Sequence, residues 1–127
     1  MEFSENKPIY KQITDHFCEQ VLSGKWKAGD RIPSVREIAV LMEVNPNTAI
    51  RAFHNLQEEE VLLNQRGVGY FVADKAREKV LKLKREEFIR EKLPSFFRDM
   101  KQLGFSCGEL ETLYNEHHAG DDSGTER

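Results

Sequence analysis

One stretch near the middle of the chain, VNPNTAIRAF, places an unusual number of polar side chains where a helix begins. Asn45 is a favoured N-cap and Pro46 a favoured first helical residue. Asn47 and Thr48 fill the first turn, and Arg51 follows one turn later. A helix start of this kind presents free backbone amides and short polar side chains, which bind phosphate oxygens and the edges of bases. The stretch therefore predicts recognition of a polyanion rather than catalysis.

No other group of side chains indicates catalysis or metal binding. Cys18 and Cys107 lie far apart and form no CxxC or zinc spacing, so we predict two reduced thiols. His117 and His118 diverge on a helix and precede a polar tail, and we interpret them as solvated. The other two histidines lie inside predicted helices without a nucleophile or base as partner. The sequence therefore predicts no enzyme, no metal and no cofactor.

The composition favours a soluble protein. The 127 residues suffice for one domain, or for a small domain with an appendage, and 39% apolar and 32% charged residues fit a modest core. No apolar run approaches the roughly 20 residues needed to cross a bilayer. The N-terminus, MEFSENKPIY, has neither the basic start nor the apolar segment of a signal peptide. We therefore predict a cytoplasmic protein with no membrane partner.

The charge balance, in contrast, is not that of a typical DNA-binding protein. Residues 1–74 contain eight Lys or Arg and eleven Asp or Glu, a net charge of −3, and residues 75–127 contain eleven of each. Nucleic-acid-binding domains are usually basic. If DNA is the partner, the basic residues must be sorted onto one face of the fold.

Apolar spacing and capping signals predict three helices in the first half of the chain. A stripe of apolar residues four apart predicts the first helix over residues 8–23. The sequence SVRE has the form of a capping box and begins a second helix that ends near Met42, with Ile38 and Leu41 directed inward. The third is the helix that VNPNTAIRAF begins, and it ends in solvent at residues 58–60.

The spacing of the apolar residues changes after the third helix. VLLNQRGVGYFVA consists of two short apolar segments around a glycine-containing tip, which is typical of a β-hairpin. Three helices followed by a hairpin form a winged helix-turn-helix, whose third helix directs its first turn into the DNA major groove. Asn47 or Thr48 would then touch base edges, and Arg51 a phosphate or a guanine. The predicted fold is mainly α with a small β-hairpin.

Residues 8–73 resemble the DNA-binding half of the GntR family of transcription regulators. The PSVRE turn, the VNPNT helix start and the RGVGYFV wing match that family in register, and the three together are highly specific. The VNPNT form and the short C-terminal region resemble its YtrA-like branch. The resemblance implies a DNA-binding regulator that represses a nearby operon, often one for transport.

The resemblance also implies which residues bind DNA. The positions that fall where the family contacts its operator are Ser34, Arg36, Asn47, Thr48, Arg51, Arg66, Gly67 and Gly69. Arg36 and Arg51 would serve the major groove or its phosphates, and Arg66 the minor groove. Pro46 and Ile50 stand where many members carry a basic residue, so two contacts of those members are missing here.

The C-terminal half is predicted to mediate dimerisation. From Lys75 to Leu103 a helical pattern is interrupted at Pro94, which kinks or breaks a helix. Spacings of four, three, four and three, typical of a coiled-coil seam, separate five apolar residues: Ile89, Leu93, Phe96, Met100 and Leu103. About 28 residues of helix reach ~42 Å, too long for the N-terminal domain to cover. A second copy would cover the stripe, and dimerisation through this region is also what the YtrA-like resemblance implies. The alternative is a helix folded back on its own domain.

The predicted domains follow from these elements. Residues 1–74 form the winged helix-turn-helix domain and residues 75–118 a helical dimerisation region. A second capping box, SCGE, begins a last short helix that ends near Asn115. Residues 119–127 are predicted to be a disordered tail.

Two functions remain open from the sequence. The first is a homodimeric regulator that binds an inverted-repeat operator in double-stranded DNA. The alternative is a winged-helix module for protein interaction without DNA, which only the acidic balance favours. Single residues also have simpler interpretations: a surface ion pair for Arg36, a helix cap for Thr48 and a solubilising position for Arg66. The sequence indicates no effector ligand.

Overall fold

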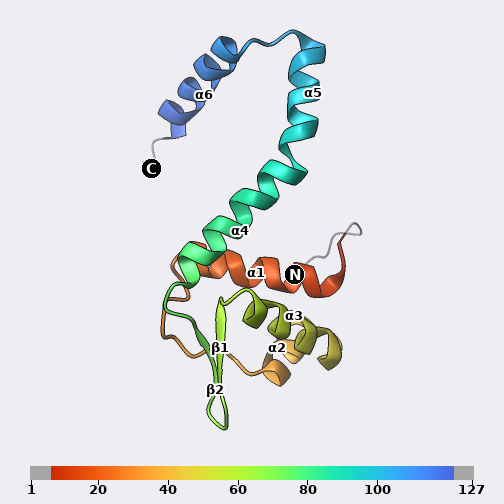
Figure 1. The fold of residues 1–127 in the computed structure, drawn as a ribbon, viewed down its shortest axis with the longest axis vertical. Helices are drawn as coiled ribbons and strands as arrows, with labels where there is room; N and C mark the ends of the chain where they lie inside the picture. The colour runs from red at the N-terminus through yellow and green to blue at the C-terminus, as the bar shows by residue number, and fades with distance from the viewer. Residues whose placement is uncertain (1–6, 122–127) are drawn as a thin grey trace. The chain divides into compact units, whose positions relative to one another are not determined.

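The computed structural model describes residues 7–121, with side chains described through His117. The chain divides after Arg85 into two compact units. The predicted fold class, a winged helix-turn-helix followed by helices, is confirmed. In the N-terminal unit α3 (Pro46–Glu58) packs against both α1 (Ile9–Leu22) and α2 (Val35–Met42), as Figure 1 shows.

The predicted helix starts are also confirmed. The Ser34 hydroxyl accepts a hydrogen bond from the Glu37 amide at 3.1 Å, and the Glu37 carboxylate accepts one from the Ser34 amide at 2.8 Å, which completes the capping box of α2. Asn45 caps α3, and Pro46 is its first residue. These local bonds fix where α2 and α3 begin, and hence which side chains their first turns present.

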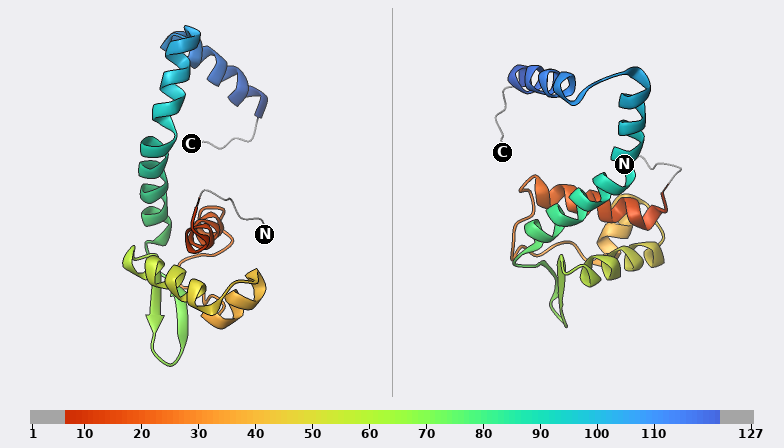
Figure 2. Two further views of the ribbon diagram at one scale, coloured as in Figure 1. Left: turned by 90° about the vertical axis from the view of Figure 1, so that its right-hand side faces the viewer. Right: turned by 45° about the horizontal axis from the view of Figure 1, so that its top comes forward.

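The predicted hairpin is present as two antiparallel strands. β1 (Leu62–Gln65) pairs with β2 (Gly69–Val72), with Gln65 opposite Gly69 next to the turn. Arg31 forms a β-bridge with Phe71 on the other edge of β2. The hairpin projects from the helical body in the views of Figures 1 and 2, as a wing does.

The core of the N-terminal unit lies between the three helices and the inner face of the hairpin. The Phe53 ring packs edge-on against Tyr70 with centroids 4.8 Å apart, which joins α3 to β2. Trp26, in the loop after α1, packs on Phe17 with ring centroids 4.8 Å apart. One core prediction is wrong: Leu41 is 71% exposed. The reason is that α2 is short, and its buried face is formed by Ile38 and Ala39 instead.

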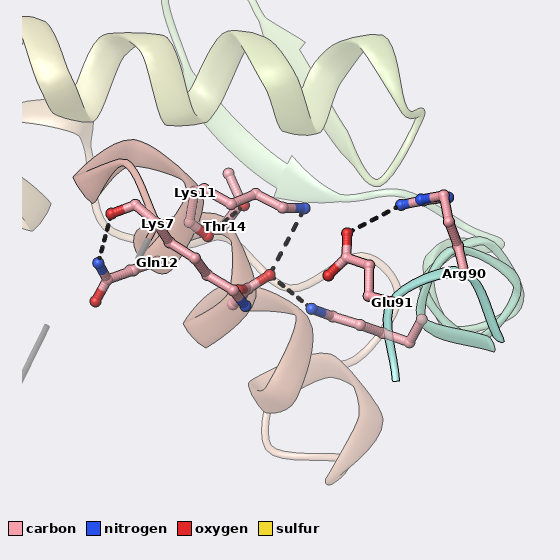
Figure 3. Close-up of polar contacts among 8 residues, drawn as sticks. Lys7, Lys11, Gln12, Thr14, Arg90 and Glu91 are labelled. Atoms are coloured by element: carbon pink, nitrogen blue, oxygen red, sulfur yellow. Dashed lines mark hydrogen bonds and ion pairs between the residues drawn. The ribbon is translucent and has the colours of Figure 1, made fainter. Parts of the chain in front are cut away.

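A cluster of lysines around one carboxylate joins α1 to α4 (Ala76–Glu91), whose first turns belong to the N-terminal unit. Asp15 accepts hydrogen bonds from Lys7 at 2.8 Å and from Lys84 at 2.6 Å, and Lys11 lies 3.7 Å away (Figure 3). Burial alone would raise the pKa of Asp15, but the lysines outweigh it, and the pKa is held below its usual value. The cluster therefore ties Lys84, in the part of α4 that belongs to the N-terminal unit, to α1.

Pro94 breaks the predicted long helix rather than kinking it. α4 ends at Glu91 and α5 (Leu93–Leu103) begins after Lys92. Proline has no amide hydrogen to donate to the carbonyl four residues earlier, and its ring clashes with that carbonyl. Gly104 ends α5 in the left-handed conformation.

The last helix is longer than predicted. The capping box of Ser106 and Glu109 is present, but α6 (Cys107–Asp121) continues past Asn115. Residues 119–121 of the predicted tail therefore form part of α6, and residues 122–127 lie outside the described residues. No helix in the described part of the chain is long and apolar enough to cross a membrane.

Candidate nucleic-acid interface

The first turn of α3 presents side chains rather than free amides. The Asn45 Oδ1 accepts a hydrogen bond from the Asn47 amide at 2.7 Å, and the Thr48 amide bonds to the Asn45 carbonyl at 2.9 Å. Pro46 has no amide hydrogen. The expectation of free first-turn amides is therefore wrong, because the cap occupies them. The Asn47 side chain is exposed and that of Thr48 half-buried, so these side chains are the groups available to a ligand.

The start of α2 combines a capping serine with an exposed arginine. The Ser34 hydroxyl is occupied as an acceptor by the Glu37 amide but retains its own proton and a lone pair. Arg36 is exposed, and its guanidinium has no ion pair or hydrogen bond with the described residues. The simpler interpretation of Arg36 as a member of a surface ion pair therefore lacks support.

Arg51 lies over an aromatic ring, a contact that was not predicted from the sequence. Its Cζ is 4.2 Å from the centroid of Tyr10, in the first turn of α1. Such a cation–π contact is worth about 0.5–1 kcal/mol at an exposed site. It uses no acceptor, so the guanidinium N–H groups remain available. Asn47 and Thr48 share a shallow hollow with both residues.

The wing turn carries the third predicted arginine. Arg66 and Gly67 follow β1, and the Val68 amide bonds to the Gln65 carbonyl at 2.8 Å to close the turn. The φ of Gly67 is +78°, a left-handed conformation that glycine adopts without strain. Arg66 is exposed and, like Arg36, has no acceptor in the part of the chain that the structure describes.

The cations of the N-terminal unit that have a carboxylate or carbonyl oxygen as partner lie elsewhere. They are on α4, on α1 or just before it: Lys7, Lys11 and Lys84 around Asp15, Lys79 beside Glu60, and Arg77 on the Leu22 carbonyl. No arginine of α2, α3 or the hairpin is neutralised in this way by a described residue. We call the residues that are predicted to bind DNA the recognition surface: Ser34, Arg36, Asn47, Thr48, Arg51, Arg66, Gly67 and Gly69. Its arginines are available to an external anion although the chain is acidic in total.

The predicted dimerisation residues lie on α4 and α5 in the C-terminal unit. Leu93 and Met100 are half-buried, whereas Ile89, Phe96 and Leu103 are exposed, Leu103 by 71%. Among the described side chains of this unit, through His117, none is buried. Two phenylalanines that the heptad spacing did not include, Phe88 and Phe97, are exposed as well. The apolar surface of this unit is therefore larger than the stripe predicted from the sequence.

Three helices and a projecting hairpin, with exposed arginines on the second and third helices and on the hairpin turn, define a winged helix-turn-helix DNA-binding protein. Comparison with known proteins identifies the family. Residues 9–72 match the model of the bacterial regulatory proteins, gntR family. The chain belongs to the GntR family of transcription regulators, in its YtrA-like branch. It is accordingly a regulator and not an enzyme.

The similarity to relatives extends over most of the chain. YhcF, an HTH-type transcriptional regulator of Bacillus subtilis, is 38% identical over 109 residues, which are 86% of this chain and 88% of YhcF. The transcriptional repressor YtrA of the same organism is 36% identical, over 84% of this chain and 79% of YtrA. The structure of a GntR-family regulator from Bacteroides thetaiotaomicron superposes with a TM-score of 0.80 and 42% identity, over 91% of this chain and all of the other.

The contact between Tyr10 and Arg51 leads to a first prediction. Replacing Tyr10 by Leu removes the ring over which Arg51 lies, so we expect operator affinity to fall about two- to fivefold, the equivalent of about 0.5–1 kcal/mol. Tyr10→Phe keeps the ring and should bind like the unmodified chain. Affinity is measured by fluorescence anisotropy on a short operator duplex.

Two observations show whether Tyr10 acts through Arg51. Tyr10 also packs on the core, so the melting temperature of each variant is measured alongside its affinity. In a chain that already carries Arg51→Ala, the Tyr10→Leu change should lower the affinity no further. A further loss in that background would show that Tyr10 acts by another route.

Proposed function

We propose that this chain is a homodimeric transcriptional repressor that binds an inverted-repeat operator through its recognition surface. Residues 1–74 contain the DNA-binding domain, and dimerisation is assigned to residues 75–118. The repressor role is supported by the similarity to YtrA of Bacillus subtilis, which is a repressor. Because the partner is chromosomal DNA of a bacterial cell, we also place the protein in the cytoplasm.

The observation that carries the homodimer is the absence of buried side chains from the described part of the C-terminal unit. Burial of apolar surface is the main favourable term in folding. A unit that buries no side chain of its own can therefore bury its apolar surface only by associating with another chain. A second copy is the simplest partner, because a two-fold axis pairs the same apolar surface from both chains. The seam spacing of Ile89, Leu93, Phe96, Met100 and Leu103 suits such a pairing.

The proposed roles within the recognition surface are those that the resemblance to the GntR family implies. Asn47 and Thr48 meet base edges in the major groove, since the α3 cap leaves their side chains as the available groups. Arg36 and Arg51 contact a guanine or a phosphate, and Arg66 enters the minor groove from the wing. Ser34 offers its remaining hydroxyl proton to a phosphate. Gly67 and Gly69 shape the wing.

The proposal predicts a symmetric, salt-dependent operator. Two equivalent recognition helices should protect an inverted repeat with half-sites about 10 base pairs apart. If each protomer makes about three phosphate contacts, the dimer makes about six, and log K should fall with log salt at a slope of about −5. Footprinting and gel shifts on the DNA upstream of the chain's own gene, at several salt concentrations, measure both quantities.

The same experiment tests the alternative function. Protection of a single unsymmetrical half-site would contradict the dimer on an inverted repeat. A slope near zero, with a folded dimer in solution, would contradict DNA recognition and favour a winged-helix module for protein interaction.

A further inference from the structure

The second glycine of the wing, Gly69, has an unusual environment. A Cβ built on Gly69 would lie 3.0 Å from the Nε of Arg31 and 3.3 Å from its Nη2, so the guanidinium occupies the space that a side chain would need. At the other described glycines with positive φ, Gly24, Gly29, Gly67 and Gly104, a Cβ would meet no atom within 4 Å. Gly69 therefore leaves space for the Arg31 side chain. None of the other four glycines leaves space for a neighbouring side chain in this way.

Backbone pairing brings Arg31 to this place. The Ile32 amide bonds to the Tyr70 carbonyl at 3.0 Å, and the Val72 amide bonds to the Asp30 carbonyl at 2.9 Å, so Arg31 lies in register with Phe71 on the free edge of β2. Opposed residues of antiparallel strands share a face, as do residues two apart on one strand. Arg31 and Gly69 are therefore diagonal neighbours on one face of the wing.

This face is not the one that packs on the helices. The neighbouring residues Ile32 and Val72 alternate with Arg31 and Phe71, and both are buried. Arg31 itself is exposed, and no described residue provides its guanidinium with an acceptor. Gly69 also pairs with Gln65, the residue before Arg66. The two wing arginines thus lie around the same glycine, one in the turn and one on the added strand.

We infer that Arg31 is a further DNA-binding residue, a phosphate contact of the wing that Gly69 holds in place. This rests on the proposed function. A guanidinium suits a phosphate because it presents several N–H donors in a planar fork. Packing of the Arg31 side chain against Gly69 restricts its rotamers before DNA is bound. Less side-chain entropy is therefore lost when the contact with the phosphate forms. The assignment adds one cation to the recognition surface from outside the helix-turn-helix.

A phosphate contact has a signature that a structural role lacks. Arg31→Ala should weaken binding to the operator and to random DNA by the same factor, since phosphate contacts carry no sequence information. The slope of log K against log salt should become less steep by about 0.9 per protomer, about 1.8 for the dimer. An unchanged slope in Arg31→Ala, while the unmodified chain binds with a steep slope, would overturn the inference. Failure of the unmodified chain to bind DNA would instead overturn the proposed function.

A double-mutant cycle tests the role of Gly69. Gly69→Ala should displace Arg31 and weaken DNA binding, but in the Arg31→Ala background the loss should be smaller, since only the backbone strain at a φ of +144° remains. Gly24→Ala is a control for a substitution at positive φ: its φ is +85°, against +144° at Gly69, and no atom lies near the new Cβ. We expect Gly24→Ala to lower the melting temperature and leave DNA affinity unchanged. Equal losses from Gly69→Ala in both backgrounds would show that Gly69 does not act through Arg31.

Discussion

Replacing Leu93 and Phe96 together by Glu is expected to convert the dimer into monomers and to lower operator affinity by about 10²- to 10⁴-fold. Both side chains belong to the apolar stripe of a unit in which no described side chain is buried. A carboxylate at each position would have to enter the seam between two copies without a partner, which is strongly unfavourable. Once the protomers separate, the two half-sites no longer bind as one unit, and the gain from their linkage is lost. Sedimentation velocity measures the oligomeric state, and gel shifts measure the affinity.

The matched control places the same two charges on another face of the same helix. Ser95 and Gln102 are exposed on α5 and, at 100° per residue, lie well over 100° from the centre of the stripe. Ser95→Glu with Gln102→Glu should remain dimeric and bind the operator with little change. If the Leu93 and Phe96 variant also remains dimeric, the protomers associate through a different surface. Monomers that retain full operator affinity would contradict the link between dimerisation and DNA binding.

Features set by neighbouring residues could be predicted from the sequence. The capping boxes at Ser34 and Ser106 and the cap at Asn45 need only three or four consecutive residues, so the pattern alone identifies them. The hairpin tip and the stop at Gly104 are local in the same sense. These signals located the recognition helix and the wing, and with them the positions whose side chains face outward.

Features that depend on packing between distant segments could not be predicted. Tyr10 meets Arg51 only because α1 packs on α3, and Arg31 meets Gly69 only because the loop after α1 pairs with β2. Leu41 follows a helical apolar pattern, yet no element among residues 7–121 covers that side of α2. The pattern of apolar residues indicates which side chains can be buried. The packing between distant segments decides which of these side chains are buried.

The second prediction with a large effect concerns Arg36 and Arg51. Each change to Ala should weaken operator binding by about 1–3 kcal/mol per half-site if the guanidinium contacts a base edge, which corresponds to a roughly 5- to 150-fold loss. Folding should be little affected, because both side chains are exposed and have no ion pair or hydrogen bond with a described residue. Arg85→Ala is the control: this exposed arginine of α4 lies outside the recognition surface, and its removal changes the net charge equally.

The way in which DNA affinity is lost distinguishes an arginine that contacts a base edge from one that contacts a phosphate. An arginine on a guanine edge should, when removed, abolish discrimination at one symmetric pair of operator positions and leave random-DNA affinity nearly unchanged. An arginine on a phosphate should lower both affinities alike and reduce the salt slope. Because Tyr10 holds Arg51 beside Asn47 and Thr48 in the hollow at the start of α3, we expect the first result for Arg51. Affinities of a panel of single-base operator variants, measured for each protein, decide the matter. Unmodified affinity in both arginine variants, with unchanged far-UV circular dichroism, would remove these residues from the interface.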